Sequence, residues 1–155
     1  SAGDGIVSVV GAAGDLVALA ERDLGRVAVI DVGTDTRIAE VPLGDALLTT
    51  CFSPDGRFLA ARHYQSGAVA ASADDTAPAL SEHVTVTELG GTPPVRRRFT
   101  IAEPVGDMTW LSPTLLAVAT PTSVEVIDVD ERTRTPIAQL AGASWWLLDA
   151  DTPGC

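Results

Sequence analysis

The chain has 155 residues, a length that suits one domain with a sizeable core. Hydrophobic residues make up 46% and charged residues 20%, as in globular rather than disordered proteins, and no apolar run is long enough to span a membrane. The net charge is −11 and every basic residue is an arginine, so the electrostatic field of the chain disfavours nucleic acids as partners.

The first predicted unit spans about residues 5–44. It holds four short segments in which apolar residues alternate or form β-branched pairs, a pattern typical of strands. We expect these strands at about 5–10, 16–21, 26–32 and 37–42. Asp31 closes the third strand, and we expect its carboxylate to accept backbone N–H groups in the turn that follows.

The second unit spans about residues 45–103, with strands expected at 47–53, 57–63, 83–89 and 95–101. Ser-Pro-Asp-Gly at 53–56 predicts a tight turn, because proline presets φ and glycine accepts a positive φ. Compared with its neighbours, this unit has about 17 additional residues at 64–81. They lack apolar periodicity and are expected to form a long surface loop.

The third unit spans about residues 104–141, with strands expected at 106–111, 115–119, 123–129 and 136–140. Asp128 closes its third strand as Asp31 closes that of the first unit, and the same turn role is expected for it. Residues 142–155 begin a fourth unit with an innermost strand.

An internal repeat connects these units. RVAVIDVGTDTR at 26–37 recurs as SVEVIDVDERTR at 123–134, with an intermediate copy HVTVTEL at 83–89. CFSPDGRFLA at 51–60 recurs as WLSPTLLA at 110–117, with a turn that is shorter by two residues. A repeat of about 40 residues with four short strands indicates a β-propeller blade. The predicted fold is therefore all-β: about three blades of four antiparallel strands plus the first strand of a fourth, within a larger ring.

Residues 25–62 resemble a blade junction of the YVTN-type and WD-repeat-like bacterial propellers. The shared features are a V-x-V-I-D strand at Val27–Asp31, a T-x-T turn at Thr34–Thr36, and F-S-P-D-G-R at Phe52–Arg57. The Tyr-Val-Thr-Asn strand and the Trp-Asp pair that name these groups are absent. The resemblance implies a closed ring, so either the remaining blades of a larger protein or a second copy of this chain is expected as partner.

Arg96, Arg97 and Arg98 form the one basic run of this acidic chain. On an outermost strand, Arg96 and Arg98 would share one face and Arg97 would take the other. They either prevent unwanted strand pairing at the edge or form a docking patch for an acidic partner or adjacent domain. Trp110 is expected in the core between blades, whereas Trp145 is expected to be exposed and is a second candidate for partner binding.

Two cysteines and two histidines are candidate cross-links or metal ligands. Cys51 and Cys155 lack the spacing of a metal site; they are either two free thiols, the simpler interpretation, or a disulfide that would indicate an oxidising compartment. His63 and His83 flank the long loop and are expected to be surface residues, with metal binding or acid–base chemistry as the alternative. No metal or other cofactor is expected.

The predicted function is a non-catalytic scaffold that binds a protein or a ligand within a larger protein or assembly. The alternatives are a part of a propeller enzyme of the lactonase or dehydrogenase type, or an extracytoplasmic sensor or lipoprotein domain. Neither a G-x-S-x-G nucleophile motif nor a phosphate-binding P-loop occurs in the sequence. The compartment is left open between the cytoplasm and an extracytoplasmic location reached after removal of a targeting segment.

Overall fold

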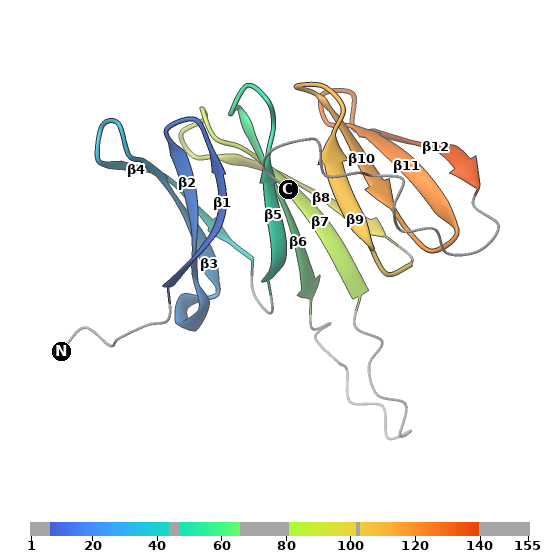
Figure 1. Cartoon of the computed structure of the whole chain (residues 1–155), viewed down its shortest axis with the longest axis horizontal. Helices are drawn as coiled ribbons and strands as arrows, with labels where there is room; N and C mark the ends of the chain where they lie inside the picture. The colour runs from blue at the N-terminus through green and yellow to red at the C-terminus, as the bar shows by residue number, and fades with distance from the viewer. Residues whose placement is uncertain (1–6, 44–46, 66–80, 102, 140–155) are drawn as a thin grey trace, which may run out of the picture.

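The computed structural model describes residues 7–43, 47–65, 81–101 and 103–139. Within these residues the chain forms three antiparallel sheets of four strands each, and in every sheet the strands lie side by side in chain order. The sheets stand next to one another (Figure 1). The only helix among the described residues is a three-residue 3-10 segment, so none of them forms a helix able to cross a membrane.

The first sheet, blade 1, is a meander of strands β1 to β4, with the 3-10 segment η1 between β2 and β3. Its elements are β1 (Val7–Ala13), β2 (Leu16–Glu21), η1 (Arg22–Leu24), β3 (Arg26–Asp31) and β4 (Thr36–Pro42). Blade 2 consists of β5 (Leu47–Phe52), β6 (Phe58–Gln65), β7 (Ser81–Glu88) and β8 (Val95–Ile101). Blade 3 consists of β9 (Asp107–Trp110), β10 (Leu115–Ala119), β11 (Ser123–Asp128) and β12 (Thr133–Gln139).

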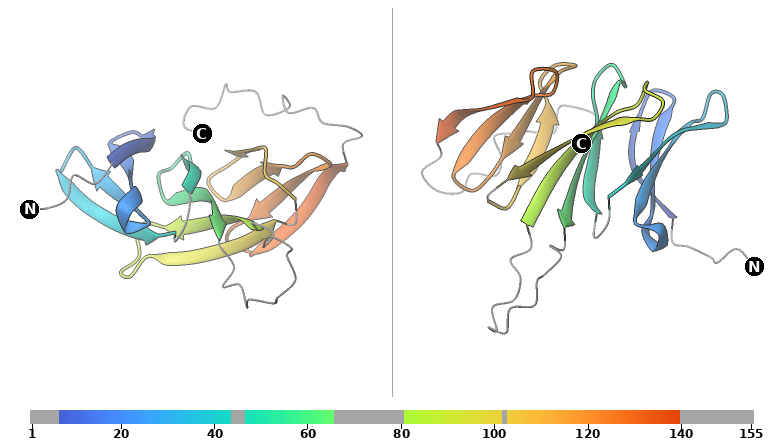
Figure 2. Two further views of the ribbon diagram at one scale, coloured as in Figure 1. Left: turned by 90° about the horizontal axis from the view of Figure 1, so that it is seen from below. Right: turned by 180° about the vertical axis from the view of Figure 1, so that it is seen from behind.

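The blades are arranged radially, with their first strands on one side and their last strands on the other. β1 neighbours β5, and β5 neighbours β9. The left view of Figure 2 shows these three strands along one side of the molecule and β4, β8 and β12 along the opposite side. The predicted all-β propeller-blade fold is thus confirmed. The predicted start of a fourth blade, 142–155, lies outside the described residues.

Some expected boundaries differ from the structure. β1 runs to Ala13 and not to residue 10, because a bulge after Val9 lets the strand continue its pairing with β2. The long loop was expected at 64–81, but β6 and β7 continue their ladder as far as the pair Gln65 and Ser81. Residues 66–80 lie outside the described part of the chain.

The turns after the third strands of blades 1 and 3 are equivalent. The Asp31 carboxylate accepts the backbone N–H of Thr34 at 3.1 Å, and the Asp128 carboxylate accepts those of Asp130 and Glu131 at 3.0 Å each. Each turn also places one non-glycine residue at positive φ, Asp35 and Arg132 respectively. The predicted turn role of both aspartates is therefore confirmed.

Two apolar clusters hold the three blades together, one at each junction. The first joins blades 1 and 2, where Val27, Val29 and Val41 of blade 1 meet Phe52 and Leu59 of blade 2. The second joins blades 2 and 3. Its largest members are Phe58, Phe99, Met108, Trp110, Leu116 and Ile127. Because side chains alternate along a strand, each sheet buries both of its faces wherever a neighbouring sheet stands on both sides.

Candidate functional site

The basic run on β8 is divided between two faces of blade 2, as strand alternation requires. Arg97 points toward blade 3, where its guanidinium donates to the carbonyl of Val129 and lies 3.6 Å from Asp130 and 3.9 Å from Glu88. Arg96 and Arg98 share the other face with Thr87 and Thr85, their register partners on β7. The run therefore does not act as one patch.

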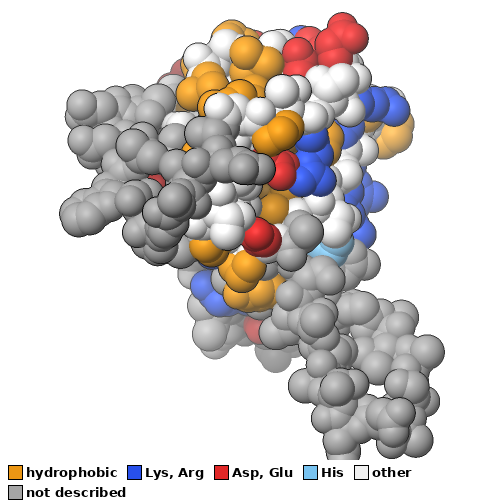
Figure 3. Space-filling model, turned by 90° about the vertical axis from the view of Figure 1, so that its right-hand side faces the viewer, with side chains coloured by type: hydrophobic (Ala, Val, Ile, Leu, Met, Phe, Trp, Pro, Cys, Tyr) orange, Lys and Arg blue, Asp and Glu red, His pale blue; other side chains and the backbone are white. Residues whose placement is uncertain are grey.

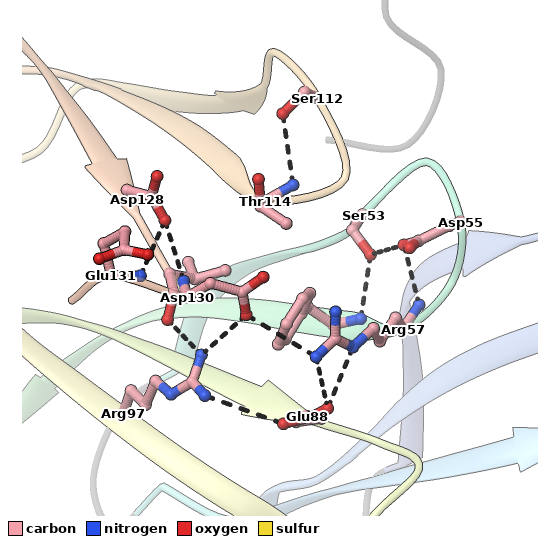
Figure 4. A network of polar contacts seen from close by, with 12 residues as sticks. Ser53, Asp55, Arg57, Glu88, Arg97, Ser112, Thr114, Asp128, Asp130 and Glu131 are labelled. Carbon is pink, nitrogen blue, oxygen red and sulfur yellow. Dashed lines mark hydrogen bonds and ion pairs between the residues drawn. The ribbon is translucent and has the colours of Figure 1, made fainter. Parts of the chain in front are cut away.

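Arg97 belongs to a polar network that closes the rim between blades 2 and 3 (Figure 4). Arg57 donates from Nε and Nη2 to Glu88 at 3.0 and 2.9 Å, and its Nη2 lies 3.7 Å from Asp130. The hydrogen bond that the Arg57 guanidinium donates to Glu88 raises the pKa of Arg57 further above its ordinary value. This network explains Arg97 as a structural residue that holds two blades together.

The tight turn at the start of this network is the one that the sequence predicted. Gly56 has φ +70° and its N–H donates to Ser53 O at 2.9 Å. The Ser53 hydroxyl donates to Asp55 at 2.6 Å and accepts the N–H of Phe58 at 2.9 Å. The equivalent Ser112 accepts the N–H of Leu115 at 3.1 Å, which is two residues closer along the chain, as expected.

The face that carries Arg96 and Arg98 also buries two histidines. His63 of β6 and His83 of β7 are directly opposite each other, their rings stack with 5.9 Å between centroids, and they are 0% and 8% exposed. The expectation that both are surface residues is wrong. The two histidines stand on the two strands of one hairpin, on either side of the inserted loop, so the pairing of β6 with β7 brings them together. Their positions at either end of the insertion were the sequence signal that could have indicated this contact.

Hydrogen bonds define the state of His63. Its Nδ1 is 3.4 Å from Tyr64 O, an atom that can only accept, and its Nε2 is 2.8 Å from Thr85 Oγ1. Because a neutral imidazole has one N–H, Nδ1 carries it and Nε2 accepts the Thr85 hydroxyl. Burial lowers the pKa of both histidines, and the positive charge of Arg98 lowers each further.

A groove open to solvent lies on this face of blade 2. Its volume is about 410 Å³ and its lining residues are Thr85, Pro94, Arg96 and Arg98. Behind it, only 1% of Thr87 is exposed, and its hydroxyl has no hydrogen-bond partner among the described residues. Figure 3 shows arginines along one edge of the molecule with a histidine beside them. We call this site the arginine groove.

The buried histidines predict a dependence of stability on pH. The unfolded chain binds protons at the ordinary histidine pKa of 6.5, whereas the folded chain, with lowered pKa values, binds them less readily. The free energy of unfolding is therefore highest above pH 6.5 and falls as the pH drops below it. Urea unfolding at about pH 8 and about pH 5.5 measures this change.

The double variant His63→Gln with His83→Gln is the control, since these are the only two histidines of the chain. We expect its stability to vary much less between the same two pH values, because no imidazole remains to be protonated. Equal stability of the parent chain at both pH values would show that the histidines are not held neutral by the fold.

The remaining residues that the sequence singled out are Cys51, Cys155 and Trp145. Cys51 is completely buried on the face of β5 that packs against blade 3, and it is in a disulfide, so the expectation of a free thiol there is wrong. Cys155 and Trp145 lie outside the described residues. The pairing of Cys51 with Cys155 and the role of Trp145 therefore stay predictions.

The disulfide prediction has a direct chemical test. Iodoacetamide added to the denatured, unreduced chain should leave both cysteines unmodified, and reduction should make both reactive; intact mass spectrometry reads the result. Denaturation is needed because burial alone would protect the Cys51 sulfur in the folded chain. Two alkyl groups on the unreduced chain would contradict the pairing.

No group of three or more His, Cys, Asp or Glu side chains that could hold a metal ion occurs in the described ranges. The arginine groove is lined by two arginines, a threonine and a proline, so among the described residues its lining contains no carboxylate and no histidine. Its chemistry suits the binding of a negatively charged group.

Comparison with known proteins supports the fold. No family model matches the chain, and no curated protein matches its sequence. Among solved structures, the chain is similar to the acylaminoacyl peptidase of Pyrococcus horikoshii, with a TM-score of 0.64 and 12% identity. The match covers 87% of this chain and 25% of that chain, so the chain spans about a quarter of the peptidase's length. At this identity, the likeness concerns the fold alone.

A second similar structure is the dihydro-heme d1 dehydrogenase NirN in complex with DHE. It is 23% identical over 84% of this chain and 35% of that chain, with a TM-score of 0.37. The class that the sheets and the peptidase match define together is a partial β-propeller of three four-stranded blades.

Proposed function

We propose that this chain is a non-catalytic scaffold segment of a β-propeller, and that it works by presenting a blade face to a further blade. The observation that carries the proposal is the outward face of blade 1, which no described residue of another blade covers. The face consists of Val7 and Val9 of β1, Val17 and Leu19 of β2, and Ala28 and Ile30 of β3.

This outward face has the composition of a buried blade junction. Val17 and Leu19 correspond through the repeat to Leu59 and Ala61 in blade 2, which are 1% exposed and pack against blade 1. In blade 1 both side chains are only half-buried, and Val9 beside them is 69% exposed. When a neighbouring blade packs on a face of this kind, apolar surface is removed from water, which favours the association.

Ion pairs border the outward face on its outer side, as the rim network borders the junction of blades 2 and 3. Arg37 lies 2.6 Å from Glu40 and 3.0 Å from Glu21, and Arg26 lies 2.9 Å from Glu40 and also pairs with Glu21. The hydrogen bond from Arg26 lowers the pKa of the Glu21 carboxyl. An apolar centre with a charged rim is the usual anatomy of a docking surface.

The occupant that fits this face is another propeller blade. At both internal junctions the equivalent face meets a pair of alternating valines on the third strand of the preceding blade, Val27 and Val29 or Val84 and Val86. The partner surface should therefore be the same valine-bearing face of a further blade. In the isolated chain, only a second copy can supply it.

Photo-crosslinking tests this proposal. Benzoylphenylalanine placed at Val9 should crosslink to another copy of the chain, and peptide mapping should place the crosslink on a blade face rather than on a turn. The matched control is the same probe at Val32, which is exposed at 57% but lies in a turn off this face. Equal crosslinking from both positions, or none from Val9, would contradict the proposal.

A further inference from the structure

The last strand of each blade carries an arginine at the same place in the repeat. Each lies opposite a third-strand residue that in turn pairs with an equivalent position on the second strand. Strand alternation directs all three side chains to the face of their blade that meets the preceding blade, which in blade 1 is the outward face. These arginines are Arg37 on β4, Arg96 on β8 and Arg134 on β12, opposite Ile30, Thr87 and Ile127.

At both internal junctions the arginine donates to the backbone of the preceding blade. Arg96 Nη1 donates to the carbonyl of Pro42 on β4 at 3.1 Å, and Arg134 Nη1 donates to the carbonyl of Thr100 on β8 at 2.7 Å. The contact joins last strands that follow one another along one side of the molecule (Figure 2). The same donor atom therefore connects neighbouring blades twice.

The two acceptor residues are equivalent as well. Pro42 pairs with the residue before Val27, and Thr100 pairs with the residue before Val84, the first junction valine of its blade. A carbonyl is present whether the residue is a proline or a threonine, so this contact depends on how one blade docks on the next and not on the acceptor's side chain. We call it the arginine clasp.

Arg37 has the same place on the outward face of blade 1, but it donates to side chains. Its Nη1 donates to Glu40 at 2.6 Å and its Nη2 to Glu21 at 3.0 Å. The side chains of Arg37 and Glu40 are 39% and 46% exposed. Glu40 thus accepts from the nitrogen that the two internal arginines use to reach a carbonyl.

Blade 3 shows that one guanidinium can form an ion pair and the clasp together. Arg134 donates from Nε and Nη2 to Glu125 at 2.9 and 2.6 Å while its Nη1 reaches Thr100. The carboxylate orients the planar guanidinium, so Nη1 is already directed at the carbonyl. In blade 1, Glu21 can take this orienting role, because it accepts from Arg37 Nη2 and its side chain is only 15% exposed.

We propose that Arg37 forms the clasp to the further blade that packs on the outward face of blade 1, and that its Nη1 exchanges Glu40 for a backbone carbonyl of that blade's last strand. The inference rests on the proposed function, because it names the contact that orients the incoming blade. In a second copy of the chain the equivalent acceptor is the carbonyl of Gln139 on β12, since Gln139 pairs with the residue before Val124.

Sedimentation equilibrium of the full chain and its Arg37 variants tests the clasp. Arg37→Gln should weaken self-association by on the order of tenfold or more, because the carbonyl of the incoming strand is then buried without its charged donor. Arg37→Lys should also weaken it, because an ammonium ion lacks the fixed fork that reaches Glu21 and a carbonyl together. Arg22→Gln removes the same charge from an exposed arginine of η1 and should leave the association unchanged.

Glu40→Gln should have the opposite effect. An amide competes less strongly than a carboxylate for the guanidinium, so association should strengthen by about two- to fivefold, the change that corresponds to the loss of an exposed ion pair. In the Arg37→Gln background the same substitution should have a much smaller effect. This double-mutant cycle separates the release of Arg37 Nη1 from the general effect of removing one negative charge.

The outcomes distinguish this inference from the proposal on which it rests. Weaker association of Arg37→Gln together with stronger association of Glu40→Gln supports the clasp. A parent chain that associates and responds to Val9→Asp, but not to Arg37→Gln, overturns the clasp and leaves the scaffold proposal standing. A parent chain that stays monomeric contradicts both. Circular dichroism verifies that each variant keeps the fold, and Arg37→Lys decides if Arg37→Gln does not.

Discussion

Replacing Trp110 with alanine should lower the free energy of unfolding by about 3–5 kcal/mol, as expected for truncation of a large buried aromatic residue. Trp110 is 4% exposed, stacks on Phe58 with 5.9 Å between ring centroids, and donates from Nε1 to Cys51 O at 3.1 Å. Its loss opens a cavity in the cluster between blades 2 and 3 and leaves a buried carbonyl without its donor. Urea unfolding followed by circular dichroism measures the change.

Trp110→Phe separates the two contributions. Phenylalanine keeps most of the packing against Phe58 but cannot donate to Cys51 O, so this variant should lose about 1–3 kcal/mol, the cost of leaving one buried polar group unpaired. A loss below 1 kcal/mol in Trp110→Ala would mean that the junction of blades 2 and 3 is not a packed core.

Gly11→Ala should destabilise the junction of blades 1 and 2 by about 1–3 kcal/mol, because it overpacks a closed site. A Cβ at this position would lie 2.7 Å from Thr50 Oγ1, and Thr50 cannot easily move away, since it is 1% exposed and donates to Val10 O at 2.7 Å. Gly90→Ala is the matched control, because a Cβ there has no atom within 4 Å.

A double-mutant cycle identifies the contact that causes this loss. Thr50→Ala removes the hydroxyl that the new methyl group would meet, so Gly11→Ala should cost much less in the Thr50→Ala background than in the parent chain. Additive effects of the two substitutions would show that β1 and β5 do not approach each other as closely as the structure has them.

The sequence was sufficient for the repeat and the blade architecture, because those depend on local signals. Alternating valines predicted the third strands, and Ser-Pro-Asp-Gly predicted a turn. The recurrence of the V-x-V-I-D pattern identified the blade as the repeating unit. Strand alternation also separated Arg97 from Arg96 and Arg98. These features need only the period of a strand and the backbone preferences of proline and glycine.

The candidate site could not be predicted from the sequence, because it depends on the register of strand pairs. His63 and His83 are separated by the insertion, and only the register of β6 with β7 makes them stacked, buried neighbours. The repeat aligns Thr85 with Glu125, but the sequence does not show that Glu125 pairs with Arg134 or that Arg96 takes the place of Arg134, because both depend on the register of the third strand with the last. Long-range pairing, rather than local propensity, decides such positions.

Sedimentation equilibrium over a wide range of concentrations tests the central claim, that this chain presents the face of a blade to a further blade. We expect reversible self-association of the parent chain. Val9→Asp should reduce it by on the order of tenfold or more, because it places a charge in the centre of an apolar interface. Val32→Asp, a charge on an exposed turn, should leave it unchanged. A parent chain that remains monomeric at all concentrations, or a Val9→Asp variant that associates as strongly as the parent, would contradict the account.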